Sequence, residues 1–325
     1  MSAYILRRLL YAIPILLGVN VITFVLFFVV NSPDDMARMQ LGQKRVTPEA
    51  IERWKDEHGY GRPLLYNAAA DGLGRLTETI FFQKSARLFV FDFGQSESGR
   101  DIGHDISQRM WPSLAIALPS LLVGLLVNLS VALLIVFFRA TYVDWGGVLL
   151  CVVLMSVSGL FYIIGGQFLV GKLLRLVPIS GYDTGLAGLK FLVLPVLIGV
   201  VSGIGSSVRF YRTLFLEEVN QDYVRTARAK GLGEAGVMFV HVLRNTLIPV
   251  LTGVVVVLPL LFLGSLLTES FFGIPGLGSY TIDAINMQDF AIVRAMVFLG
   301  SVLYILGLAM TDLSYAVVDP RVRLS

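Results

Sequence analysis

The stretch that decides the fold is residues 111–138, WPSLAIALPSLLVGLLVNLSVALLIVFF, which contains no charged side chain. It is longer than the roughly 20 apolar residues with which a helix crosses a membrane. Five other uncharged stretches have the same character, namely residues 9–30, 145–171, 191–208, 245–268 and 295–311. The sequence therefore predicts an all-α membrane protein with six transmembrane helices.

The composition of the whole chain agrees with this prediction. Of 325 residues, 55% are hydrophobic and 15% charged, and the mean hydropathy is +0.75, whereas soluble domains average about 45–50% apolar and about 25% charged residues. The net charge is +3 and the basic residues form no dense run, so a nucleic acid is not an expected partner. Cys151 is the single cysteine, which excludes an intrachain disulfide and a thiolate metal cluster.

The distribution of lysine and arginine predicts the orientation in the membrane, because these residues favour short cytoplasmic loops. With the N-terminus inside, the cytoplasmic pieces hold eleven of them and the short outer loops hold four. The eleven are Arg7, Arg8, Arg139, Arg209, Arg212, Arg225, Arg228, Lys230, Arg244, Arg321 and Arg323, and the four are Lys172, Arg175, Lys190 and Arg294. The prediction is that both termini are cytoplasmic.

Four regions follow from the spans. Residues 1–30 form an N-terminal segment with the first transmembrane helix, which is too long for a signal peptide and has no A-x-A cleavage site after it. Residues 31–110 are extracytoplasmic, residues 111–318 form a core of five helices, and residues 319–325 are a cytoplasmic tail. In the outer segment, Thr47 and Pro48 are expected to begin a helix that ends before Gly59. The segment is either a solvated cap or a surface that contacts substrate.

A loop at residues 209–244 interrupts the apolar spans with polar sequence. Two short helices are expected in it. The first begins near Asn220 and Asp222 and ends at Lys230, with Gly231 just beyond the last turn, as cap preferences and the helix dipole favour. The second begins near Glu234 and ends by Arg244.

The small residues Ala227, Ala229 and Gly231 leave one face of the first loop helix without bulk. A second protein can approach such a face closely, so the loop is a candidate docking segment. The alternative is an ordinary solvated, charged loop.

Residues 223–232, YVRTARAKGL, and residues 241–249, HVLRNTLIP, resemble the EAA loop of ABC-importer permeases, in particular the B-type subunit of dipeptide and oligopeptide systems. Further similar stretches occur in the same order, at residues 4–10, 61–64, 92–96, 275–278 and 319–323. The chain departs from the general EAA pattern at Arg225 and Arg244, which stand where that pattern has an acidic residue and a proline; both look usual for the peptide-type subfamily.

The resemblance implies the type I ABC importer permease fold, with a cytoplasmic coupling helix formed by Arg225, Thr226, Ala227, Arg228, Ala229, Lys230 and Gly231. It also implies that the chain imports peptides across a bacterial cytoplasmic (inner) membrane. The implied partners are a second, non-identical permease, two ATP-binding subunits that carry ATP and Mg, and an extracytoplasmic substrate-binding protein.

The sequence offers no catalytic, metal or cofactor site of its own. Residues 166–173 resemble part of a phosphate-binding loop, but Leu173 stands where serine or threonine is required. His58, His104 and His241 lie outside the spans, and no G-x-S-x-G or H-E-x-x-H motif occurs. An intramembrane enzyme and an ion-driven secondary transporter remain as alternatives. The lack of an internal repeat weighs against the second of these, since inverted repeats mark many such carriers.

Two carboxylates lie beside or within the apolar stretches, Glu269 after the fifth and Asp312 near the end of the sixth. Carboxylates in such positions are costly in lipid and usually face the bundle interior or water. Glu269 is therefore a candidate for lining the substrate path, with a structural anchor as the alternative. Asp312 is expected to be structural.

Overall fold

A computed structural model describes residues 2–42 and 46–318, so the predicted tail at 319–325 lies outside the described residues. The described part is helical apart from turns and a single isolated bridge between Gln95 and Asp101. Its first elements are α1 (Ser2–Phe24), the π-helical η1 (Val25–Val30), α2 (Pro33–Leu41), α3 (Pro48–Glu57), α4 (Gly74–Thr77), η2 (Phe81–Ser85) and η3 (Ala86–Val90).

The remaining elements carry most of the apolar sequence. In chain order they are α5 (Ile102–Phe137), α6 (Tyr142–Ser156), α7 (Gly159–Gly166), η4 (Gln167–Leu173), η5 (Leu186–Gly188), α8 (Leu189–Val219), α9 (Asp222–Ala229), α10 (Glu234–Gly236), η6 (Val237–Val242), α11 (Leu243–Val257), η7 (Pro259–Leu263), α12 (Leu266–Phe272), α13 (Leu277–Asn286) and α14 (Phe290–Val318). An all-α membrane fold is thereby confirmed.

The described residues contain five helices that are long and apolar enough to cross a membrane, together with one bent pair of helices. The five are Leu10–Val30, Ile102–Phe137, Leu186–Val219, Glu234–Leu263 and Phe290–Ser314. The predicted third span is the bent pair: α6 and α7 meet at 89°. Val157 is extended there and Gly159 opens the second helix, so this stretch is a broken span or a re-entrant loop and not one straight helix.

Two expected helix boundaries are wrong. The predicted second loop helix does not end at Arg244, because α10, η6 and α11 form one run into the fifth span. That span in turn ends at Leu263 rather than at residue 268. Pro259 has no N–H group to donate and Gly264 has a φ of 70°, so the chain turns and Thr268 belongs to α12.

The chain divides into two compact units, which are described separately. One combines the residues up to Arg109 with Tyr280–Ala309, and the other is built on Met110–Ser279. The four predicted regions do not follow this division, and they stay a prediction.

The core of the first unit is aromatic. Phe24, Phe28, Trp54 and Tyr60 are all at least 93% buried, and burying one such side chain stabilises a fold by about 1.5–3 kcal/mol. The expected helix α3 is present, with the Thr47 hydroxyl accepting a hydrogen bond from the Ala50 amide at 3.3 Å. The core thus holds the end of the first span against the start of the outer segment.

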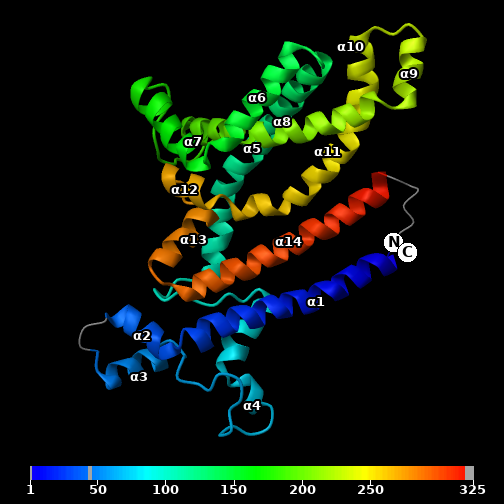
Figure 1. Cartoon of the computed structure of the whole chain (residues 1–325). Helices are drawn as coiled ribbons and strands as arrows, with labels where there is room; N and C mark the ends of the chain where they lie inside the picture. The colour runs from blue at the N-terminus through cyan, green and yellow to red at the C-terminus, as the bar shows by residue number, and fades with distance from the viewer. Residues whose placement is uncertain (1, 43–45, 319–325) are drawn as a thin grey trace. The chain divides into compact units, whose positions relative to one another are not determined.

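The core of the second unit surrounds the polar loop. Val224 and Ala227 of α9 pack with Val237 and Met238 of η6 and with Phe215 of α8, and all five are buried. Within this unit, α9 and α10 stand at the ends of α8 and α11, away from α7 and α12 (Figure 1). The polar loop is therefore an ordered extension of the apolar helices.

Candidate coupling and translocation sites

The end of α9 has the backbone geometry that its sequence predicts. The Leu232 amide donates to the Ala227 carbonyl at 3.3 Å, and the Gly231 amide donates to the Arg228 carbonyl at 2.9 Å. This pair of bonds is a Schellman motif, which requires a residue in the left-handed region. Gly231 supplies that residue, with a φ of 81°.

The side chains of α9 divide into an inner and an outer face. Ala227 is 4% exposed and packs inside its own chain, so it is not part of the surface that a partner can touch. Arg225, Ala229, Lys230 and Gly231 are exposed. The face without bulk is therefore centred on Ala229 and Gly231, and Ala227 supports it from within.

Three charged residues join α9 to the ends of α5 and α10. The Glu234 carboxylate lies 2.9 Å from an Arg228 Nη atom and 3.1 Å from an Arg139 Nη atom. All three side chains are 33–36% exposed, so solvent screens them only in part. These charge-assisted hydrogen bonds, which are stronger than neutral ones, connect α9 to the end of α5.

Two further contacts hold the base of the loop. Arg212 of α8 donates to Asp144 at the start of α6 at 2.7 Å, and the Asp144 side chain is 12% exposed. The Tyr223 hydroxyl donates to the Glu218 carboxylate. Burial, aided by this hydrogen bond, raises the pKa of Tyr223 to about 12, so the phenol stays protonated and keeps donating at physiological pH.

Glu269 lies in α12 and its carboxylate is enclosed by its own chain. The residue is 1% exposed, and its two oxygens accept hydrogen bonds from the amides of Ser265 and Ser279, each at 3.1 Å. Burial raises the pKa of Glu269, and the hydrogen bonds oppose that shift. A Cβ atom on Gly264 or Gly276 would overlap this carboxylate, so both glycines are needed for the close approach.

A cavity of about 350 Å³ lies beside this carboxylate. Its polar lining comes from α5, α8 and the start of α12, and the polar residues are Ser113, Ser120, Ser202, Ser265, Thr268 and Glu269. Glu269 thus borders a cavity and also binds the first turn of α13 through the Ser279 amide. The substrate-path role stays a prediction.

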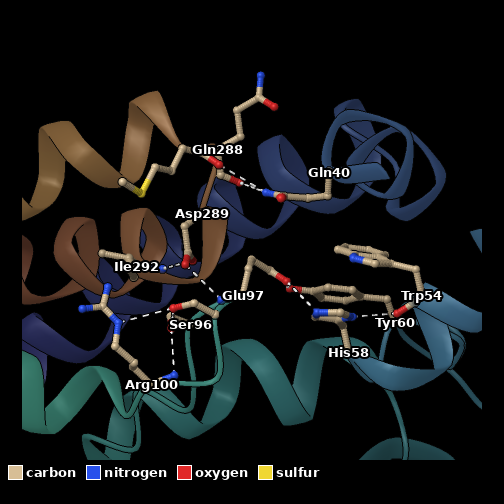
Figure 2. A network of polar contacts seen from close by, with 12 residues as sticks. Gln40, Trp54, His58, Tyr60, Ser96, Glu97, Arg100, Gln288, Asp289 and Ile292 are labelled. Carbon is tan, nitrogen blue, oxygen red and sulfur yellow. Dashed lines mark hydrogen bonds and ion pairs between the residues drawn. The ribbon is translucent and has the colours of Figure 1, made fainter. Parts of the chain in front are cut away.

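The first unit contains a polar network that joins the outer segment to the turn before α14 (Figure 2). The Glu97 carboxylate accepts from the Tyr60 hydroxyl at 2.8 Å, and the Glu97 amide donates to Asp289 at 2.9 Å. Gln40 donates to the carbonyls of Met287 and Gln288, both at 3.2 Å. The outer segment is therefore anchored to the residues that open the last span.

Sequence reasoning missed both polar clusters. Arg139 and Glu234 are 95 positions apart and Glu97 and Asp289 are 192 apart, so no local pattern pairs them. A local signal existed only for individual members: Asp289 precedes an apolar helix and accepts from the Ile292 amide as its N-cap. In the described part of the chain, no group of three or more His, Cys, Asp or Glu side chains is arranged to hold a metal ion.

Comparison with known families decides the class of protein. Residues 130–324 match the family described as the binding-protein-dependent transport system inner membrane component. Residues 1–70 match the N-terminal part of the membrane components of such systems. The chain belongs to this family. As an inner membrane component it is a multi-pass permease subunit, and its family description implies a substrate-binding protein and further subunits.

Curated relatives of this transport component cover it almost from end to end. A protein of Brucella abortus (strain 2308), named for a permease of a peptide transport system, is 32% identical over 99% of both chains. The di/tripeptide transport system permease protein DppB of Pseudomonas aeruginosa (strain UCBPP-PA14) is 30% identical over 99% of both chains. The oligopeptide transport system permease protein AppB of Bacillus subtilis (strain 168) is 29% identical over 99% of this chain and 100% of the relative. The predicted ABC permease of peptide type is thereby confirmed.

Proposed function

We propose that this chain forms one half of the membrane channel of an ATP-driven importer for di- and oligopeptides. The observation that supports this most directly is the α9 surface, a capped helix with an exposed small-residue face tied by Arg228, Glu234 and Arg139 to α5. The remaining parts of the proposed complex are a second, non-identical permease, two ATP-binding subunits that carry ATP and Mg, and an extracytoplasmic binding protein. This chain itself does no chemistry: closure of the ATP-binding subunits displaces α9, and the helices move as rigid elements.

Reconstitution tests this function. The complex, co-purified with its partner subunits and placed in vesicles, is expected to accumulate a dipeptide only when ATP, Mg and the binding protein are all supplied. Uptake that follows an imposed ion gradient without ATP would instead establish the alternative, an ion-driven secondary transporter.

We also propose that both termini are cytoplasmic, with α9 inside and the segment after α1 outside. In a Cys151→Ser background, Leu73→Cys is expected to react with a membrane-impermeant thiol reagent added to sealed right-side-out vesicles, whereas Gln221→Cys is not. Both positions are exposed in the structure, so burial within this chain does not explain a lack of reaction. Reaction of Gln221→Cys from outside would reverse the orientation and remove α9 from the side of the ATP-binding subunits.

Glu269 is proposed to border the peptide path at the cavity beside α12, where a carboxylate can attract the amino terminus of a peptide. Glu269→Gln removes the charge and keeps a carbonyl oxygen, so uptake of free-amine dipeptides is expected to fall more than uptake of N-blocked ones. The comparison is made at matched amounts of membrane-inserted protein. Equal loss for both peptide classes would leave Glu269 as a structural anchor alone.

A further inference from the structure

The first and last spans provide a level from which depth in the membrane can be judged. The rings of Phe27, near the end of the first span, and Phe290, at the start of the last, lie 5.4 Å apart. Both residues belong to candidate membrane spans, Leu10–Val30 and Phe290–Ser314. This ring pair therefore marks where both spans meet the side of the membrane that carries the outer segment.

The segment Phe81–Val90 reaches below that level. The Asn20 side-chain amide donates to the Ser85 carbonyl at 3.0 Å, and the rings of Phe89 and Phe298 are 5.4 Å apart. Asn20 lies seven positions before Phe27 and Phe298 eight after Phe290, and a helix rises about 1.5 Å per residue. Two helices that run in opposite directions thus both place the segment about 10–12 Å below the ring pair.

The backbone of the segment is suited to that depth. Irregular backbone in a membrane is tolerated only where protein buries it or where it lines a water-filled cavity. The carbonyls of Ser85 and Lys84 accept from the Asn20 amide and from the buried Arg294 guanidinium, at 3.0 and 3.4 Å. Ser85 and Leu88 are 2% and 5% exposed. One side of the segment is therefore packed against the two spans.

The other side carries charge beside the exposed apolar side chains of Phe82, Val90 and Phe91. Arg87 lies 3.6 Å from Asp92, and their side chains are 55% and 49% exposed. Arg87 lies two positions after Ser85, which is bonded to Asn20, and two positions before Phe89, which contacts Phe298. Its backbone therefore lies at the same depth as these two residues. Charged side chains inside a membrane usually face a water-filled cavity rather than lipid.

We propose that residues 81–92 form a re-entrant segment that lines a water-filled part of the peptide path, where Arg87 and Asp92 present opposite charges to the passing peptide. The identity of the passing substrate rests on the proposed peptide-importer function, whereas the depth of residues 81–92 rests on geometry alone. Arginine binds carboxylates through two parallel hydrogen bonds, so Arg87 is the residue that distinguishes acidic from basic peptides.

Depth and exposure to water are tested in the assembled complex, in a Cys151→Ser background. A fluorophore on Val90→Cys is expected to be quenched more by nitroxides near the middle of the lipid acyl chain than by nitroxides near the headgroup. A water-soluble thiol reagent is expected to label Arg87→Cys but not Ile22→Cys, which is 62% exposed on α1 at a similar depth. Stronger quenching from the headgroup, or no labelling of Arg87→Cys, would overturn the proposal.

Selectivity is tested by Arg87→Glu. The ratio of acidic to basic dipeptide uptake is expected to fall at least about threefold, because the charge facing the peptide is reversed. Arg75→Glu is the matched control: it makes the same charge change in α4, before the re-entrant segment, at an exposed site where Arg75 donates to the Ala70 carbonyl. An equal shift in both variants would contradict a path-lining role for Arg87. If the complex transports no peptide at all, the proposed function fails, while the depth and labelling measurements still decide where the segment lies.

Discussion

Replacing Gly231 with tryptophan is expected to lower peptide uptake by the assembled transporter about tenfold or more, while the protein remains inserted and the ATP-binding subunits remain able to hydrolyse ATP. No atom outside its immediate chain neighbours lies within 4 Å of a Cβ atom built at Gly231, so a new side chain has room to leave the backbone. It projects from the exposed face of α9. A loss of about 1.4 kcal/mol in docking free energy is enough for the tenfold effect.

Two control variants separate bulk from backbone strain. A non-glycine residue at the φ of 81° costs about 1–2 kcal/mol, and asparagine tolerates this region better than most residues, so Gly231→Asn is expected to retain most uptake. Gly233→Trp adds the same ring two positions away, where φ is −65° and the space is also open. Measuring uptake and ATP hydrolysis in all three variants decides whether bulk or backbone strain causes the loss of uptake. Normal uptake by Gly231→Trp would show that this face does not dock.

The second large effect is expected at Glu269. In Glu269→Ala, the amides of Ser265 and Ser279 lose their acceptor; Ser279 is buried, whereas Ser265 is exposed and water can reach it. A buried unsatisfied group costs about 1–3 kcal/mol, so the free energy of unfolding is expected to fall by about 2 kcal/mol. The thermal midpoint of the purified complex and the amount of inserted protein both report this loss.

Two further variants test the cause of the loss in Glu269→Ala. Glu217 is exposed on α8, so Glu217→Ala removes a carboxylate from a solvated site and is expected to stay within about 0.5 kcal/mol of the native protein. Gly276→Ala keeps the carboxylate but pushes a Cβ atom into it, and it is expected to mimic the loss at Glu269. A complex with Glu269→Ala that is as stable as one with Glu217→Ala would exclude the anchoring role.

The features predicted correctly from sequence depend on neighbouring residues alone. A run of about 20 uncharged apolar residues is sufficient to indicate a span, and this held for five of the six stretches as single helices. The left-handed Gly231 after α9 and the Thr47 cap of α3 were also predictable, because caps are set by residues within one turn.

The predicted helix boundaries were wrong where one local sequence pattern is compatible with two different helical structures. An apolar run of 27 residues, 145–171, is compatible with one long helix or with two that meet at an angle, and the packing of α6 and α7 against α8 accompanies the second outcome. The run 234–244 was expected to end as a separate helix, but a six-residue π-helical stretch, Val237–Val242, carries the chain into the fifth span. In each run the composition is the same for either structure, so composition alone cannot distinguish the two structures.

By itself the sequence determined the membrane class, the number of apolar stretches and the position and cap of the loop helix, since each depends on composition or on contacts within a turn. Only the tertiary structure decided that Ala227 faces inward, that Glu269 is enclosed by the amides of Ser265 and Ser279, and that Glu234 joins Arg228 to Arg139. It likewise placed Ser85 beside Asn20 and Phe89 beside Phe298. These arrangements bring together residues that are distant in the chain or select one face of a helix, and that choice is made by packing, which no local pattern encodes.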